Sequence, residues 1–250
     1  MNVMVFDTET TSLDKPFCYN IGYIVLDTDK EVALVKRDFV VEQVWHNLPL
    51  FQTAYYADKR PIYVSEMKAH RTIMDKFGYI CRQMARDIKA FEITSAYAYN
   101  SPFDEKVFTF NCDWFKCINP FDNVPIYDIR GYAHQFICNT EEYIAFCEEN
   151  ELFTDAGNYS TTAETLFKYV SKNTDFEEEH TALADSEIET LILLEAIKKG
   201  AEYATEYAVK RSLERNVQKT LQIVHNKETI ASFQYQKITI NKEKTKITLK

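Results

Sequence analysis

The spacing of apolar and polar positions predicts that the chain opens with three β-strands. Residues 3–6 form a short apolar run, and residues 21–26 and 32–41 form two further runs of strand length. A polar turn over residues 27–30 separates the second and third runs, so we expect these two to form a hairpin. The opening segment therefore favours a strand meander.

The middle of the chain alternates between helical and extended patterns. Residues 43–64 hold two prolines and many aromatics without a clear period, and we expect them to be irregular. Ser65 is a suitable N-cap for a helix over residues 66–91, where apolar positions recur at helical spacing. We expect a strand over residues 93–99, a break at 100–102, a helix from about residue 103, and a loop over 111–127.

The second half is mainly helical. One helix is predicted near Asp128, and a second, capped by Asn139 or Thr140, continues to residue 149. Residues 161–164 have a capping-box pattern for a helix to about residue 172, and a long helix follows from about 181 to 199, or as far as 208. Two β-like runs, 230–240 and 245–249, end the chain. This order predicts an α/β fold, with a mixed sheet flanked by helices and a C-terminal β-like appendage.

Length and composition are those of a soluble globular protein. The 250 residues suit one large domain with an extension, which we divide into residues 1–208 and 209–250. No apolar run approaches the roughly 20 residues needed to span a bilayer. The N-terminal residues lack the basic segment and the apolar length of a signal peptide. We therefore expect a cytoplasmic protein with no membrane partner.

The charge is unevenly distributed between the body and the C-terminal extension. Residues 210–250 carry ten Lys and Arg and three Glu, a net +7, and the net charge of −9 therefore leaves −16 on residues 1–209. Lysines interleaved with Phe233 and Tyr235 are typical of single-strand nucleic-acid contacts. Lysine-rich edge strands also occur simply to prevent aggregation. The sequence leaves both interpretations of the basic extension open.

The six cysteines indicate neither a zinc site nor a disulfide framework. None is spaced as C-x-x-C, which makes a zinc site improbable. A chain of this size without an export signal is expected to keep its thiols reduced and buried.

Asp7 and Glu9 form the first candidate catalytic motif. Side chains at i and i+2 of a strand point to the same face, so the two carboxylates are expected to lie side by side at the end of the first strand. Their mutual repulsion is relieved by a divalent cation, and oxygen ligands suit Mg²⁺ or Mn²⁺. A solvated turn with incidental acids is the alternative.

Two later motifs also carry acidic residues. Asp104 lies in the first turn of a helix that follows an apolar strand, where an acid also favours the helix dipole for purely structural reasons. His180 and Asp185 are five residues apart, about 140° around a helix. We therefore place His180 in the loop just before the helix and Asp185 one turn into it. A surface histidine beside the acidic run 177–179 is the alternative.

Together these motifs resemble the DEDDh branch of the DnaQ-like exonucleases. The family pattern D-T-E-T-T-G-L appears here as Asp7 to Leu13, with Ser12 in place of the usual glycine. The second family motif, Asn and then Asp with Phe before the Asp, is matched by Asn100, Phe103 and Asp104. The third, H-x-A-x-x-D, is matched by residues 180–185. The resemblance covers about residues 1–200 and implies a ribonuclease-H-like mixed sheet.

The resemblance also implies an activity and roles for the residues that match. It implies a metal-dependent 3′→5′ exonuclease, with DNA or RNA bearing a free 3′ end as partner and two Mg²⁺ ions, replaceable by Mn²⁺, as cofactors. Asp7, Glu9, Asp104 and Asp185 would be the metal ligands, and His180 would be the general base. The predicted substrate-binding residues are Thr8, Thr10, Leu13, Asn100 and Phe103.

Three rival interpretations concern the substrate and the reaction. RNA or a very short oligonucleotide would replace single-stranded DNA without changing the chemistry, because the two polymers differ at the 2′-OH. A nucleic-acid-binding module on an inactive exonuclease fold would not need all five catalytic residue types. An aspartyl phosphatase would need a second Asp at the position of Glu9. The sequence gives no indication of the oligomeric state.

Overall fold

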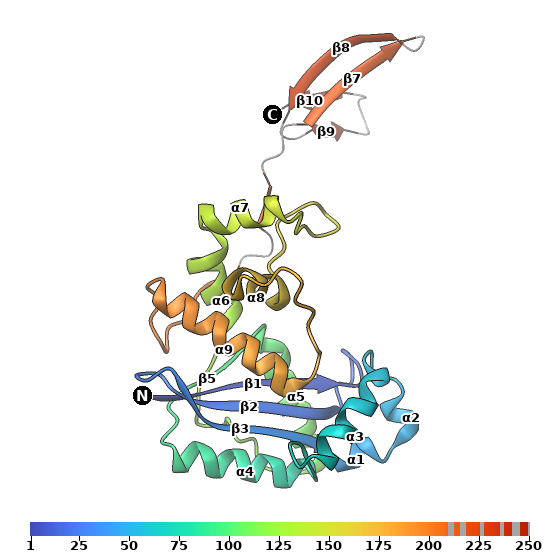
Figure 1. The fold of residues 1–250 in the computed structure, drawn as a ribbon. Helices are drawn as coiled ribbons and strands as arrows, with labels where there is room; N and C mark the ends of the chain where they lie inside the picture. The colour runs from blue at the N-terminus through green and yellow to red at the C-terminus, as the bar shows by residue number, and fades with distance from the viewer. Residues whose placement is uncertain (210–212, 216–218, 226–227, 236–237, 242–245, 250) are drawn as a thin grey trace.

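A six-stranded mixed sheet forms the centre of the protein (Figure 1). The computed structural model describes residues 1–209, 213–215, 219–225, 228–235, 238–241 and 246–249. The strand order is β4-β3-β2-β1-β5-β6, in which β1, β2 and β3 are antiparallel and the other three pairings are parallel. The bounds are β1 Asn2–Thr10, β2 Cys18–Asp27, β3 Val32–Val41, β4 Ile73–Asp75, β5 Ala96–Ala98 and β6 Ile126–Asp128. The predicted strand meander and mixed sheet are confirmed.

Helices cover both faces of this sheet. Short helices follow β3, namely α1 Glu42–Trp45, α2 Leu48–Phe51, η1 Ala57–Lys59 and α3 Arg60–Lys68. The next two are α4 Phe77–Ala90 and α5 Ser101–Phe115. The remainder are α6 Ile129–Ala133, the π-helical turn η2 His134–Cys138, α7 Glu141–Glu149, α8 Ala163–Ser171 and α9 Ala182–Lys198.

The alternation of side chains along β1 separates the core into two halves. Met4 and Phe6 point into the cluster built with α1 to α5, whereas Val3 and Val5 point into the cluster built with α6 to α9. All four side chains are completely buried. The central strand is therefore apolar on both faces, and α9 covers the Val3 and Val5 face.

The single helix predicted over residues 66–91 is wrong. The chain leaves α3 at Lys68, and His70 adopts a left-handed conformation with φ 57°. Residues 73–75 then pair with β3 as a parallel edge strand, and the Thr72 hydroxyl donates a hydrogen bond to the buried Asp38 carboxylate. A new helix begins at Phe77, whose N–H donates to Gln43. Tertiary pairing with β3 thus overrides a helical apolar pattern.

Other predicted boundaries also change. Residues 43–64 are largely helical rather than irregular, and the loop expected over 111–127 contains the end of α5 and strand β6. Helix α9 ends at Lys198, before Gly200 with φ 105°. The chain beyond it packs on the core, where the backbone N–H groups of Ala204 and Thr205 donate to the tyrosines Tyr97 and Tyr132.

The C-terminal extension forms two separate two-stranded sheets. They are β7 Lys219–His225 with β8 Glu228–Tyr235, and β9 Ile238–Asn241 with β10 Lys246–Leu249. The predicted run 230–240 is therefore shared between β8 and β9. The side chains of the basic extension beyond Arg215, including Phe233 and Tyr235, lie outside the described residues. The Arg215 guanidinium donates to the Glu148 carboxylate at 2.5 and 2.8 Å, and the division at residue 208 stays a prediction.

The cysteines lie mostly in the interior of the protein. All six cysteines are free, and five are buried. Cys81, Cys112 and Cys117 converge from α4 and from the end of α5, and the Cys112 thiol donates to the Ile118 carbonyl at 3.3 Å. In the part of the chain that the structure describes, no helix combines the length and the apolarity needed to cross a membrane.

A buried carboxylate links the hairpin to α4. Asp87 accepts hydrogen bonds from the Tyr23 hydroxyl at 2.7 Å, from Arg37 Nε at 2.6 Å and from Gln83 Nε2 at 3.0 Å. Burial raises the pKa of Asp87, but the hydrogen bonds from Arg37 and Tyr23 outweigh it and hold this pKa below its ordinary value. The ionised carboxylate therefore stabilises the fold.

We expect Asp87→Ala to lower the free energy of unfolding by about 3 kcal/mol at pH 7, because it leaves a part-buried guanidinium without its partner. The contribution of a carboxylate with a depressed pKa is complete above its unfolded value and is lost as pH falls through its folded value. Urea unfolding at pH 7 and near pH 3 should therefore show a smaller difference between variant and wild type at the lower pH. The exposed Asp155→Ala is the control. An equal difference at both pH values would contradict this assignment.

Candidate active site

Three carboxylates from β1 and α9 meet at one end of the sheet. Asp7 and Glu9 continue the face of β1 that Val3 and Val5 occupy, and α9 crosses this face. Asp185, in the first turn of α9, therefore lies opposite them. Ligating oxygens of Asp7, Glu9 and Asp185 all lie within 4.8 Å of one another. The structure thus brings together three of the predicted residues that are far apart in sequence.

The start of α9 lies directly against β2. Gly22 allows this approach, since a Cβ there would lie 2.1 Å from Leu183 N and 2.2 Å from the carbonyl carbon of Ala182. The Ser186 hydroxyl donates to the Gly22 carbonyl at 3.1 Å, and Ala182 N–H donates to the buried Asn20 side chain at 2.8 Å. The Asn20 side chain of β2 therefore provides an acceptor for a backbone N–H group at the start of α9. These contacts fix the height of Asp185 above β1.

Asp104 reaches the same end of the sheet from α5. The left-handed residue Asn100, φ 63°, turns the chain from β5 into α5, and its N–H donates to Asp128 at 2.8 Å. Asp104 is 2% exposed and accepts a hydrogen bond of 2.6 Å from the Thr8 hydroxyl. Thr8 lies between Asp7 and Glu9 and points to the opposite face of β1. The candidate site residues therefore lie on both faces of β1 near its end.

His180 occupies the loop just before α9, as predicted. Its backbone is left-handed with φ 56°, and its Nδ1 lies 3.6 Å from a Glu178 carboxylate oxygen. Its ring stacks on Tyr56, with the ring centroids 4.2 Å apart and the planes at 13°. Burial and the neighbouring Lys59 charge lower the pKa of His180. The imidazole is then neutral at pH 7, the form that accepts a proton.

The clustered acids are strongly perturbed. Burial raises the pKa of Asp7, Glu9 and Asp185, and the negative charges of neighbouring acids raise each further. The pKa of Asp104 is raised by burial and by Asp7, against the Thr8 hydrogen bond. Among the described residues, no Lys or Arg forms an ion pair with any of these four carboxylates.

The donor set fits hard divalent cations. One buried carboxylate oxygen of Asp185, Oδ1, has no hydrogen-bond partner, which is costly unless a cation or water occupies that position. Carboxylate oxygens without a neighbouring protein cation are the ligands that Mg²⁺ and Mn²⁺ prefer. Asp7, Glu9 and Asp185 together offer such a set, with Asp104 beside them.

Two further acids belong to this cluster, although neither was predicted to be a site residue. Glu178 groups with His180 and Asp185, with ligating atoms within 4.8 Å of one another. Glu189, 3% exposed and one turn after Asp185 on α9, accepts a hydrogen bond of 3.2 Å from Tyr99 N–H, and burial raises its pKa. The i, i+4 spacing of Asp185 and Glu189 was the available signal.

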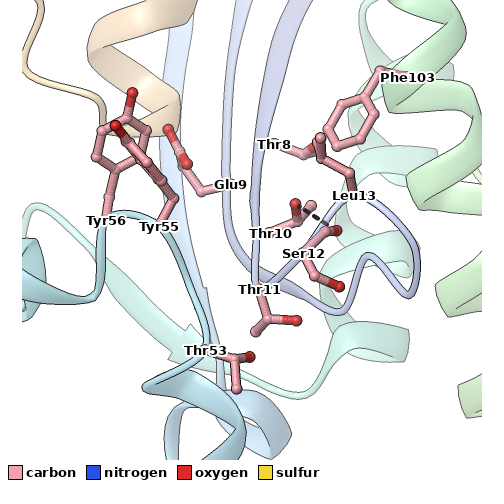
Figure 2. A pocket seen from close by; sticks show the side chains of 10 residues that line it. All are labelled: Thr8, Glu9, Thr10, Thr11, Ser12, Leu13, Thr53, Tyr55, Tyr56 and Phe103. Carbon is pink, nitrogen blue, oxygen red and sulfur yellow. Dashed lines mark hydrogen bonds between the residues drawn. The ribbon is translucent and has the colours of Figure 1, made fainter.

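An open pocket of about 430 Å³ lies beside the carboxylates (Figure 2). Four predicted substrate-binding residues line it, namely Thr8, Thr10, Leu13 and Phe103. Asn100 instead lines a separate cavity with Arg130 and Tyr159. Thr53, Tyr55 and Tyr56, from the segment expected to be irregular, also line the pocket. Its volume is that of a small-molecule site.

Two solved structures align with this chain. The nuclease domain of 3′hExo, described as a DEDDh family member bound to rAMP, aligns with a TM-score of 0.56 at 13% identity, over 84% of this chain and 96% of that one. E. coli Exonuclease I in complex with a dT13 oligonucleotide aligns with a TM-score of 0.48 at 15% identity, over 80% of this chain and 41% of that longer one. No protein-family model matches, and no curated protein matches. The 3′hExo likeness shows that the chain shares the fold of that nuclease domain, which agrees with the predicted mixed sheet flanked by helices.

Proposed function

We propose that the protein is a metal-dependent 3′→5′ exonuclease that acts mainly on single-stranded DNA. The observation that carries this proposal is the convergence of Asp7, Glu9 and Asp185 beside an open pocket, where no Lys or Arg of the described residues forms an ion pair with them. Asp104 and His180 complete the five residues of the DEDDh motif. The likeness of the fold to a DEDDh nuclease domain supports the same activity.

Each residue of the site has a role in this proposal. Asp7, Glu9, Asp104 and Asp185 would hold two Mg²⁺ ions. When bound, the ions neutralise the phosphate and stabilise the attacking and leaving oxygens. His180 takes the proton from the attacking water, for which its lowered pKa leaves it unprotonated at neutral pH. Thr10, Leu13 and Phe103 contact the terminal nucleotide.

The acidic charge of the body agrees with this proposal. Residues 1–209 carry a net −16, and a site that concentrates divalent cations must itself be acidic. The basic extension, +7 over residues 210–250, is then an auxiliary surface for the substrate backbone or a structural appendage. The side chains that would decide between these two roles lie outside the described residues.

RNA is the second candidate substrate. The 3′hExo nuclease domain that shares this fold was solved with rAMP, a ribonucleotide. Recognition of RNA would require a contact to the 2′-OH in the pocket, which is lined by Thr10, whose hydroxyl donates to the Ser12 carbonyl at 3.4 Å. A parallel assay with DNA and RNA of one sequence separates the two.

Incubation of end-labelled DNA and RNA oligonucleotides with Mg²⁺ or Mn²⁺ tests the activity. We expect stepwise release of mononucleotides from the 3′ end, complete loss of activity in EDTA, and recovery on adding excess Mg²⁺. A 3′-phosphorylated oligonucleotide should resist, because the terminal nucleotide no longer fits. Equal cleavage of circular single strands would show an endonuclease. Binding of oligonucleotides without hydrolysis under any metal condition would indicate a non-catalytic module.

A further inference from the structure

The segment between β3 and β4 reaches the pocket from the side opposite to the β1 loop. Between α2 and η1 the chain passes the end of β1 and places Thr53, Tyr55 and Tyr56 at the pocket. Figure 2 shows the two tyrosines on one side of Glu9, with Leu13 and Phe103 on the other. The pocket therefore has two walls that carry apolar side chains, with Glu9 between them.

This second wall is held firmly by the core. Phe51 and Ala54, on either side of its start, are 1% and 7% exposed. The Phe51 ring contacts the rings of Tyr19 and Trp45 at centroid distances of 5.0 and 5.2 Å. The Arg60 guanidinium lies 3.9 Å from the Trp45 ring centroid and donates to the Trp45 carbonyl at 3.2 Å. The tyrosines thus project from a rigid base.

The two tyrosines differ in what they contact. Tyr55 is 89% exposed, and its one ring contact within the described part of the chain is with the edge of Tyr56, at 4.8 Å and 89° between ring planes. An aromatic ring so exposed contributes little to folding. Tyr56 is half-buried, and its ring lies parallel to the His180 ring at 4.2 Å. One ring is free for a ligand, and the other supports the histidine.

Among the described residues, the His180 ring forms no hydrogen bond. It precedes α9 in a left-handed turn, and its Nδ1 faces Glu178 at 3.6 Å, beyond normal hydrogen-bond length. The stack on Tyr56 is therefore the contact that sets the plane of the imidazole. A general base must be held within a narrow range of orientations for proton transfer.

We propose that Tyr55 stacks on the unpaired base of the terminal nucleotide, opposite Leu13 and Phe103, and that Tyr56 is a positioning residue for His180. The proposal rests on the exonuclease function proposed above. A base that enters between two apolar walls must leave its duplex partner and its stacked neighbour. The pocket thereby selects single-stranded 3′ ends, and the segment 53–56 is a specificity element.

Steady-state kinetics on a single-stranded oligonucleotide separate the two roles. Tyr55→Ala should raise KM about tenfold and leave kcat within about twofold, since stacking on one base is worth about 1–3 kcal/mol. Tyr56→Ala should lower kcat at least about tenfold with KM little changed, and Tyr56→Phe, which keeps the ring, should restore it. Tyr79→Ala, a 54% exposed tyrosine on α4, is the matched control.

Two measurements without turnover distinguish failure of this proposal from failure of the exonuclease function. With Ca²⁺ in place of Mg²⁺, Tyr55→Ala should weaken oligonucleotide binding about tenfold relative to Tyr79→Ala. In proton NMR spectra, Tyr56→Ala should shift the His180 ring signals downfield as the stacked ring is lost, and Tyr56→Phe should not. Wild type without hydrolysis would overturn the function alone. Unchanged binding by Tyr55→Ala, or unchanged kcat in Tyr56→Ala of an active enzyme, would overturn this proposal.

Discussion

Replacing Asp7 with alanine is expected to abolish hydrolysis without lowering the melting temperature. Asp7 lies with Glu9 and Asp185 in a cluster whose negative charges raise one another's pKa. Removing one carboxylate relieves repulsion in the metal-free protein. It also removes one of the four carboxylates that we propose would hold the metal ions, which would supply several kcal/mol of charge stabilisation. Since each 1.4 kcal/mol is a factor of ten, we expect at least about a thousandfold loss of rate.

Three measurements on Asp7→Ala check this expectation. They are kcat/KM on a labelled oligonucleotide, calorimetric binding of Mn²⁺, and thermal unfolding without metal. Asp113→Ala, which removes an exposed carboxylate on α5, should leave all three unchanged. Near-normal turnover by Asp7→Ala would place the chemistry elsewhere. A melting temperature lowered by several degrees would instead make Asp7 a structural residue.

Local patterns predicted the elements that depend on local sequence. The runs before Asp7 and around Ile24 are apolar at nearly every position, and both are long strands buried on two faces. Thr140, one of the two caps predicted for this helix, caps α7 by accepting from Tyr143 N–H. The strands β4 and β6 were not predicted, because a run of three residues is too short to show a strand pattern against the pattern of the neighbouring residues. They exist through pairing with β3 and β5.

The site residues also divide into those that local sequence predicted and those that tertiary packing places at the site. The motifs predicted Asp7, Glu9 and Asp185, and the structure brings them together. Tyr56 could not be predicted, because its contact with His180 joins residues 124 positions apart through packing of an aromatic segment without periodicity. Contacts of this kind follow from tertiary structure alone. The catalytic and metal-binding roles of the motif residues remain predictions.

Gly22 has no reactive group, but its place in β2 also affects the geometry of the site. A glycine in a strand weakens it, and a close approach of another backbone is one reason to keep it. Here the approaching backbone is the first turn of α9, which brings Asp185 and the preceding His180 to the site. Gly22 pairs with Asp7 across β1 and β2. The same place in the sheet therefore determines the positions of the start of α9 and of the Asp7 carboxylate.

Gly22→Ala is therefore expected to lower kcat about a hundredfold in a protein that still folds. The added methyl would lie 2.1 Å from Leu183 N, so the start of α9 must move by roughly 1 Å, a shift that can cost a factor of about 100. Overpacking should also lower the free energy of unfolding by about 1–3 kcal/mol. Gly157→Ala is the matched control, because its φ of 76° strains an alanine while nothing lies within 4 Å of the new methyl. It should lose stability but keep kcat, measured for all three proteins well below their melting temperatures. A folded Gly22→Ala enzyme with wild-type kcat would show that the position of α9 on β2 does not set the geometry of the site.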